Sequence, residues 1–270
     1  MLRSLVWVRK AMKSSQKIDA ERYSRQIMIP YFGLESQEKL LGSKVLVVGA
    51  GGLGGPVIMY LAAAGVGNLT VVDFDVVEES NLQRQVIHAE KIGWNKAESA
   101  KDFAEKLNPD VRVKAIKEKI EPENVMEIIR GHDVVVSCPD NLRTRFILND
   151  ACRIADIPLV HGAIFEFEGE AMTIRSTPCY RCLYPAAPPL KIPGIIGATA
   201  GVIGSIQAVE ALKIITGIGK TLSGLLKIDL QTMEFFNIEI EPNKECPICS
   251  GKLRKIYPEN YSDSCRVVKF

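Results

Sequence analysis

From Lys44 to Gly162, short runs of β-branched residues alternate with longer stretches in which apolar residues recur every three or four positions. This alternation is typical of strand–helix–strand units. The strand runs are almost continuously apolar, which indicates strands covered on both faces, as in a parallel sheet. We therefore predict an α/β fold with a Rossmann-like, doubly wound, mostly parallel sheet. The predicted strands are Lys44–Val48, Leu69–Asp73, Val111–Ile116, Asp133–Ser137 and Leu159–Gly162, and the predicted helices are Leu53–Ala64, Asn95–Leu107, Glu123–Ile129 and Leu142–Ala155.

Past Gly162 the pattern changes. Apolar and polar residues alternate around Gly169, which predicts a β-hairpin and an extension of the sheet by antiparallel strands. Residues Cys182–Gly197 contain four prolines and predict an extended loop of a length that usually has a function. A helix is predicted over Thr199–Thr216, where apolar residues recur at helical spacing. Its apolar face suits packing in the core, and a homodimer contact is the alternative.

The composition fits a globular protein, because 47% of the 270 residues are hydrophobic and 24% are charged. The 34 Lys and Arg residues nearly balance the 32 Asp and Glu residues, which argues against bulk nucleic-acid binding. The apolar stretches Val57–Val72 and Ile192–Ile215 are both interrupted, so we expect no membrane span and a cytoplasmic location. We divide the chain into a basic, disordered extension (1–20), one domain (21–250) and a C-terminal tail (251–270).

The segment Gly49-Ala50-Gly51-Gly52-Leu53-Gly54 directly follows a predicted strand and precedes a predicted helix. In this context glycines permit a tight turn, and the free N–H groups of the helix N-terminus face phosphates. Asp73 ends the next strand, where a carboxylate can accept hydrogen bonds from ribose hydroxyls. The motif predicts a nucleotide site, and a glycine turn that only serves packing is the alternative.

A triphosphate needs more positive charge than the half charge of one helix N-terminus. Arg84, in the segment NLQRQ, can fork onto phosphate oxygens, and Lys96 begins the next predicted helix. Asp140 and Asn141 follow another strand, and a carboxylate beside a triphosphate suits a Mg²⁺ ion. Taken singly, the cations would be solvated surface charges and Asp140 or Asn141 a helix cap. Taken together at the strand ends, they predict an ATP site.

Two CxxC pairs, Cys179 with Cys182 and Cys246 with Cys249, give four thiolates at the spacing of a tetrahedral zinc site. Four sulfur ligands leave no position for water, so the site would be structural. A redox function of the pairs is the alternative.

The other three cysteines show no ligand spacing. Cys138 and Cys152 lie in apolar sequence and are expected to be buried, whereas the place of Cys265 in the tail allows it to be exposed. The three histidines have no ligand spacing either, and we assign them no metal.

These motifs occur together in one order, and with Arg22-Tyr23-Ser24-Arg25-Gln26 they make the chain similar to the MoeB/ThiF adenylyltransferases, relatives of the ubiquitin-activating enzymes. The pattern is nearest to that of MoeB, the adenylyltransferase of the molybdopterin-synthase sulfur carrier. The resemblance covers about residues 21–250. It implies adenylation of the C-terminal glycine of a small β-grasp sulfur-carrier protein that ends in Gly-Gly, with release of pyrophosphate.

The resemblance also implies functions for single residues. Asp73 would hold the ribose, Arg84 and Lys96 the phosphates, and Asp140 the Mg²⁺ ion. The counterpart of Arg25 reaches the triphosphate of the other subunit in such enzymes, which implies a homodimer. The residues assigned to the nucleotide site are Gly49, Gly51, Gly52, Gly54, Asp73, Asn81, Arg84, Lys96, Asp140 and Asn141.

One departure concerns cysteine. ThiF-like members carry a cysteine in the crossing segment that links to the carrier, but Leu183–Thr199 contains none. We therefore expect adenylation alone, with sulfur supplied by another protein and the pathway, whether molybdopterin, thiamine, modified tRNA or protein conjugation, left open.

Two other functions compete with adenylation. An NAD(P)-dependent Rossmann oxidoreductase would use the glycines and Asp73, but gives no role to Arg84, Lys96 or Asp140. A zinc-stabilised nucleotide-binding module without catalysis is the second alternative.

Overall fold

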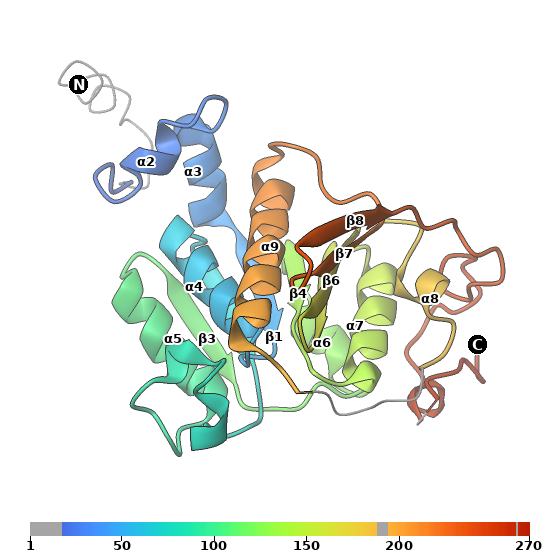
Figure 1. Cartoon of the computed structure of the whole chain (residues 1–270). Coiled ribbons are helices and arrows are strands. Elements are labelled where there is room, and N and C mark those ends of the chain that lie inside the picture. Colours follow the sequence, from blue (N-terminus) through green and yellow to red (C-terminus); the bar gives the residue numbers. More distant parts are fainter. Residues whose placement is uncertain (1–17, 188–193, 263) are drawn as a thin grey trace.

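Eight strands form one sheet in the computed structural model, which describes residues 18–187, 194–262 and 264–270 (Figure 1). The strand order is β3-β2-β1-β4-β5-β6-β7-β8. The first five are parallel, and β6, β7 and β8 are antiparallel to their neighbours. This confirms the predicted fold class. The strands are β1 (Lys44–Val48), β2 (Asn68–Val72), β3 (Arg112–Ile116), β4 (Val134–Ser137), β5 (Leu159–Phe165), β6 (Glu168–Ile174), β7 (Leu225–Asp229) and β8 (Glu234–Ile238).

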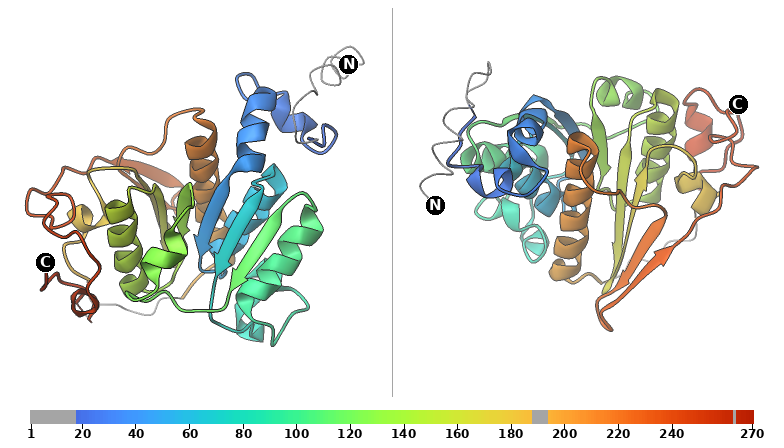
Figure 2. Two further views of the ribbon diagram at one scale, coloured as in Figure 1. Left: turned by 180° about the vertical axis from the view of Figure 1, so that it is seen from behind. Right: turned by 90° about the horizontal axis from the view of Figure 1, so that it is seen from above.

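Helices cover both faces of the sheet, and a separate hydrophobic core fills each interface (Figure 2). On one face lie α4 (Gly54–Ala64), α5 (Lys96–Leu107) and α9 (Gly197–Thr216), with α3 (Gly33–Gly42) against α9 and the short α2 (Ser24–Ile27) beside α3. The other face carries α6 (Val125–Ile129) and α7 (Leu142–Ala155), and α8 (Tyr180–Leu183) packs on α7. Three 3₁₀ helices complete the described elements: Glu79–Asn81, Val86–His88 and Pro258–Tyr261.

The predicted elements agree with these bounds to within two residues, except that β5 continues to Phe165. The predicted hairpin is present as β5–β6, with its turn at Glu166 and Phe167. Gly169 lies inside β6, where a Cβ atom would be 2.3 Å from Cγ1 of Ile203, so the glycine lets α9 approach the sheet. The sequence analysis did not predict α2, α3 or the β7–β8 hairpin. The basic extension at residues 1–17 and residues 188–193 of the Pro-rich loop lie outside the described residues.

Helix α9 is long and apolar enough to cross a membrane by length and composition alone. In this fold it instead packs against α4, β5 and β6, and Ala200, Ile203, Ala208 and Ala211 are fully buried. The predicted packing of this helix in the core is therefore confirmed for its inner face. Val209, which is 53% exposed, lies on its outer face.

The C-terminal tail is part of the folded protein. The side chain of Arg181 is buried, and its Nε lies 2.8 Å from both carboxylate oxygens of Asp150 on α7. Arg181 Nη1 donates to the carbonyl oxygen of Cys265 at 2.7 Å, and the hydroxyl of Tyr261 donates to Asp150 at 3.0 Å. One buried ion pair thus fastens the tail to α7.

The cysteines outside the CxxC pairs are all buried. This confirms the prediction for Cys138 and Cys152, and burial raises the pKa of both thiols. Cys265 is only 1% exposed, so the expectation that its place in the tail allows exposure was wrong. The tail folds back onto the second core, which the sequence pattern after Cys249 does not reveal.

Candidate functional site

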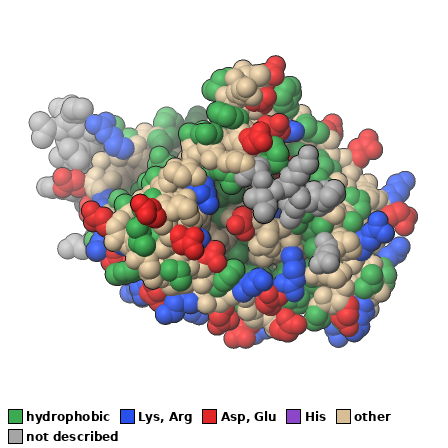
Figure 3. Space-filling view, turned by 60° about the horizontal axis from the view of Figure 1, so that its bottom comes forward, with side chains coloured by type: hydrophobic (Ala, Val, Ile, Leu, Met, Phe, Trp, Pro, Cys, Tyr) green, Lys and Arg blue, Asp and Glu red, His purple; other side chains and the backbone are tan. Residues whose placement is uncertain are grey.

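A cavity of about 840 Å³ lies at the carboxyl ends of the parallel strands. The strand order reverses between β1 and β4, and open α/β sheets bind ligands in the crevice at this switch point. One part of the wall, here the glycine side, comes from the loops after β1 and β2. The opposite part, here the β6 side, comes from residues 163–165 of β5, residues 168–170 of β6, and Lys227 of β7. Figure 3 views this face from beneath and shows charged side chains of both signs around a hollow.

The glycine loop after β1, residues 49–54, is held in place by close packing against Cys138 and by hydrogen bonds to Asp73. Gly49 has a φ of 93°, and a Cβ atom there would lie 2.7 Å from the carbonyl oxygen of Cys138, so only glycine fits. The Asp73 carboxylate accepts the N–H of Ala50 at 2.7 Å and that of Asp75 at 2.9 Å. Burial raises the pKa of Asp73 despite these hydrogen bonds. Gly51, Gly52 and Asp73 all line the cavity.

A histidine outside the cavity wall supports the same loop. His88 Nε2 lies 2.7 Å from the carbonyl oxygen of Ala50, and Nδ1 lies 2.8 Å from the hydroxyl oxygen of Ser99. Nε2 must carry the proton, because a carbonyl oxygen only accepts. Burial lowers the pKa of His88, so the ring is neutral near pH 7. These two hydrogen bonds give His88 a structural role beneath the glycine loop.

Both predicted cations line the cavity. Lys96 is buried at the first position of α5, and its Nζ lies 3.1 Å from the Asp75 carboxylate. The Asn95 side chain caps this helix by accepting from two backbone N–H groups, which fixes the direction of its N-terminus. Arg84 donates to the carbonyl oxygen of Ser80 at 3.2 Å and lies beside Gly52. The glycine side therefore combines a helix N-terminus with two side-chain cations.

Asp140 and Asn141 follow β4 and also line the cavity. Asp140 is exposed, with its carboxylate open to a ligand. The Asn141 side chain accepts the N–H of Thr144 at 2.9 Å and caps α7, so the alternative of a helix cap holds for Asn141. Asp140 is thus the available carboxylate at this strand end.

Three predicted site residues lie outside the cavity wall. Gly54 lies under the loop, where a Cβ atom would be 1.9 Å from the carbonyl oxygen of Gly49. Asn81 is buried, and its side chain accepts the N–H of Glu78 at 3.2 Å. Arg25 is exposed on α2. The structure therefore brings together Gly49, Gly51, Gly52, Asp73, Arg84, Lys96, Asp140 and Asn141, but not these three.

The sequence analysis missed the polar residues of the β6 side. Glu170 lies 3.1 Å from His161 Nε2 and accepts the hydroxyl of Tyr184 at 3.2 Å. Tyr180 and Tyr184 also line the cavity, and so does Arg145 in the first turn of α7. Arg145 could have been found by reasoning like that used for Lys96, since it lies in the first turn of a helix that follows a strand end.

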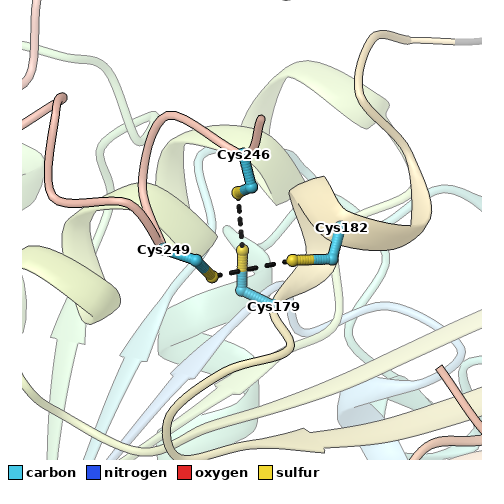
Figure 4. Close-up of side chains that lie close together, drawn as sticks. All are labelled: Cys179, Cys182, Cys246 and Cys249. Carbon is cyan, nitrogen blue, oxygen red and sulfur yellow. Dashed lines mark hydrogen bonds between the residues drawn. The ribbon is translucent and has the colours of Figure 1, made fainter. Parts of the chain in front are cut away.

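The four CxxC cysteines come together between α8 and the segment before the tail (Figure 4). All four sulfur atoms lie within 4.8 Å of one another, with Cys179 and Cys246 at 3.7 Å and Cys182 and Cys249 at 3.6 Å. A tetrahedron with zinc–sulfur bonds of about 2.3 Å places its sulfurs about 3.8 Å apart. The donor set and its spacing therefore fit zinc.

Comparisons with known proteins agree with this geometry. A model of the ThiF family matches residues 23–248. The chain is 49% identical over 257 residues to the SAMP-activating enzyme E1 of Haloferax volcanii, covering 92% of this chain and 95% of that protein. It is 44% identical over 245 residues to the adenylyltransferase and sulfurtransferase MOCS3 of Drosophila sechellia, covering 87% of this chain and 54% of that one. The chain thus spans about half the length of the Drosophila relative.

The fold also matches a solved structure. The structure of E. coli MccB with ATP superposes with a TM-score of 0.77 at 23% identity, covering 86% of this chain and 75% of that chain. At this identity the likeness concerns the fold.

Proposed function

The chain belongs to the ThiF family and is an adenylyltransferase, and we propose that it uses ATP to adenylate the C-terminal glycine of a small β-grasp sulfur-carrier protein ending in Gly-Gly. The observation that supports this most is the extent of the cavity. It begins at the glycine loop, passes Asp140 after β4, and continues to Lys227 on β7. A nucleotide on the glycine side leaves the β6 side for a second substrate.

The chemistry needs positioning more than acid–base groups. An oxygen of the glycine carboxylate attacks the α-phosphorus, the bond to the bridging oxygen breaks, and pyrophosphate leaves with that electron pair. A carboxylate needs no general base, but it must approach an anion. Two unit charges 4 Å apart repel by about 4 kcal/mol at an effective dielectric constant of about 20. Cations at the site offset this repulsion, and alignment lowers the barrier further.

We assign the nucleotide contacts by the positions of the side chains. Asp73 would accept hydrogen bonds from the ribose hydroxyls, which would partly replace the one it accepts from the N–H of Ala50. Arg84 and Lys96 would bind the phosphates. Asp140 would hold Mg²⁺, which supplies charge neutralisation at the transferring phosphorus; one protein carboxylate plus phosphates suits this ion. Cys179, Cys182, Cys246 and Cys249 would hold the structural zinc.

The direct test is carrier-dependent exchange of labelled pyrophosphate into ATP. We expect exchange with at least one small Gly-Gly-ended protein of the source organism, and binding of ATP with Mg²⁺ in preference to NADH. A protein that binds NADH but does not bind ATP would favour the oxidoreductase alternative. In that reaction Arg84, Lys96 and Asp140 would have no role. A protein that binds ATP but shows no exchange with any of these carriers would favour the alternative of a nucleotide-binding module without catalysis.

The proposal includes a homodimer in which Arg25 reaches the partner's triphosphate. Arg25 lies outside the cavity of its own chain, on the layer formed by α2, α3, α4 and α9. Exposed apolar residues are frequent on this layer, and such surfaces mark protein interfaces. They are Met28, Ile29, Tyr31, Tyr60 and Val209.

Mixing two inactive variants tests the shared site. Arg25→Ala and Lys96→Ala homodimers should each lose most of their exchange activity. Random mixing makes half of the dimers mixed, and each mixed dimer has one intact site, so about a quarter of the wild-type activity should return. Mixed dimers seen by native mass spectrometry without recovered activity would contradict the assignment of Arg25.

The remaining assignments concern the cellular setting. The relatives are named for SAMP activation and for adenylyl and sulfur transfer. Because Leu183–Thr199 contains no cysteine, we propose that this chain performs adenylation alone in the cytoplasm and that a separate sulfur donor completes the reaction. Cys265 does not replace the missing nucleophile, since its side chain is buried.

A further inference from the structure

Arg145 is the half-buried cation at the junction of the two parts of the cavity. It extends from the first turn of α7, between Asp140 on one side and Glu170, Tyr180 and Tyr184 on the other. Its Nε and Nη2 both donate to the carbonyl oxygen of Pro139 at 3.1 Å. This contact uses the Nε–Nη2 edge of the guanidinium, and the uncharged Tyr180 side chain is a second hydrogen-bond partner of the group. The Nη1–Nη2 edge carries two N–H groups, and a carboxylate binds such an edge more strongly than a neutral hydroxyl does.

No carboxylate of the described residues lies within 4.0 Å of Arg145, whereas other arginines of this region have one. Arg143, two residues earlier, pairs with Glu121, and Arg181 pairs with Asp150. The nearest acid on the β6 side, Glu170, is already bonded to His161 and Tyr184. Burial opposes ionisation of Glu170, but the hydrogen bond and charge of His161 and then the charge of Arg145 lower its pKa, so the positive charge of Arg145 acts on the β6 side.

We propose that the Nη1–Nη2 edge of Arg145 binds the terminal carboxylate of the carrier and directs it at the α-phosphate. A guanidinium edge and a carboxylate form two parallel hydrogen bonds, which fix the plane of the carboxylate as well as its position. The contact to Pro139 sets the guanidinium orientation from the loop that also carries Asp140. The same loop would therefore position the nucleophile and the metal. This inference rests on the proposed function and adds the residue that recognises the second substrate.

A carrier with a C-terminal amide separates carboxylate binding from a structural role. The probes are the Gly-Gly-ended carriers that support exchange, each prepared as free acid and as amide. Their affinities are measured with Mg²⁺ and α,β-methylene ATP, so that the bound carrier cannot react. For the wild type we expect the acid to bind about tenfold to a hundredfold more tightly than the amide. In Arg145→Ala this ratio should fall to within about twofold, and Arg145→Lys should keep part of it, since it keeps the charge but not the fork.

Arg143→Ala is the matched control. It removes an arginine of the same helix turn that binds Glu121 and the carbonyl oxygen of Tyr261 but does not line the cavity, so the acid-to-amide ratio should stay at the wild-type value. If Arg145 only held the loop through Pro139, Arg145→Ala would weaken ATP, acid and amide alike and preserve the ratio, which would overturn the inference. If the wild type exchanges with no carrier, the proposed function itself is wrong, and the inference falls with it.

Discussion

Replacing Asp140 by Ala should abolish carrier-dependent exchange while the protein stays folded. The side chain is exposed and makes no hydrogen bond with the described residues, so its removal costs little stability. Loss of a metal ligand beside the transferring phosphorus removes several kcal/mol of stabilisation; at about 4 kcal/mol the rate falls about a thousandfold. The measurement is the exchange rate at saturating carrier and Mg²⁺, together with the thermal midpoint.

Two further variants make the result specific. Asp140→Asn keeps the shape of the side chain but lacks its charge, so it should be nearly as inactive as Asp140→Ala. Glu127→Ala removes an exposed carboxylate from α6, outside the cavity, and should exchange like the wild type. Asp140→Ala with more than a tenth of the wild-type rate would show that the residue does not hold the metal.

Removing the metal from the four-cysteine site should unfold the region around it. Zinc contributes about 10 to 16 kcal/mol in small peptides, as much as the whole stability of a typical domain. Without it, four thiols remain packed within 4.8 Å of one another. After chelation, we expect hydrogen exchange to rise strongly in the segments around α8, the second CxxC pair and the tail. The amides of β1, β2 and β4 should stay protected, because these strands are hydrogen-bonded to neighbours on both sides and one of their faces packs in the first core, which contains none of the four cysteines.

Cysteine variants distinguish zinc loss from simple thiol removal. Cys246→Ser should lower zinc from one per chain to a small fraction and reproduce the exchange pattern of the chelated protein. Cys152→Ala removes another buried cysteine, outside the cluster, and should keep the metal at a cost of about 1 to 2 kcal/mol. A protein that contains no zinc, or that shows the same exchange with and without it, would contradict the structural site.

Part of the cavity at the strand ends was predictable because several of its residues follow a strand directly. Gly49, Asp73 and Asp140 are within three residues of a strand end, and parallel strands bring their carboxyl ends to one edge. The four cysteines were predictable for a different reason, since their spacing alone specifies the ligand geometry.

The β6 side was not predictable in the same way. Glu170 lies inside a strand and Tyr184 after a short helix, and they meet only through tertiary packing. Strand β8 was missed because all five of its residues are exposed, so neither a buried run nor an alternation of burial marks it. The burial of the tail was not predictable either. It depends on the ion pair between Arg181 and Asp150, which are 31 positions apart, and no sequence pattern indicates that these two residues pair.

The pairing of Cys179 with Cys246 spans 67 residues, and this separation has a consequence for the order of folding. The second cysteine pair lies after β8, so the site cannot be complete until the ribosome has made all eight strands. Closing so long a loop is entropically costly, and metal binding offsets that cost. The five parallel strands and the glycine loop are therefore synthesised well before the second cysteine pair, and the nascent chain can form its parallel core before the proposed zinc site is complete.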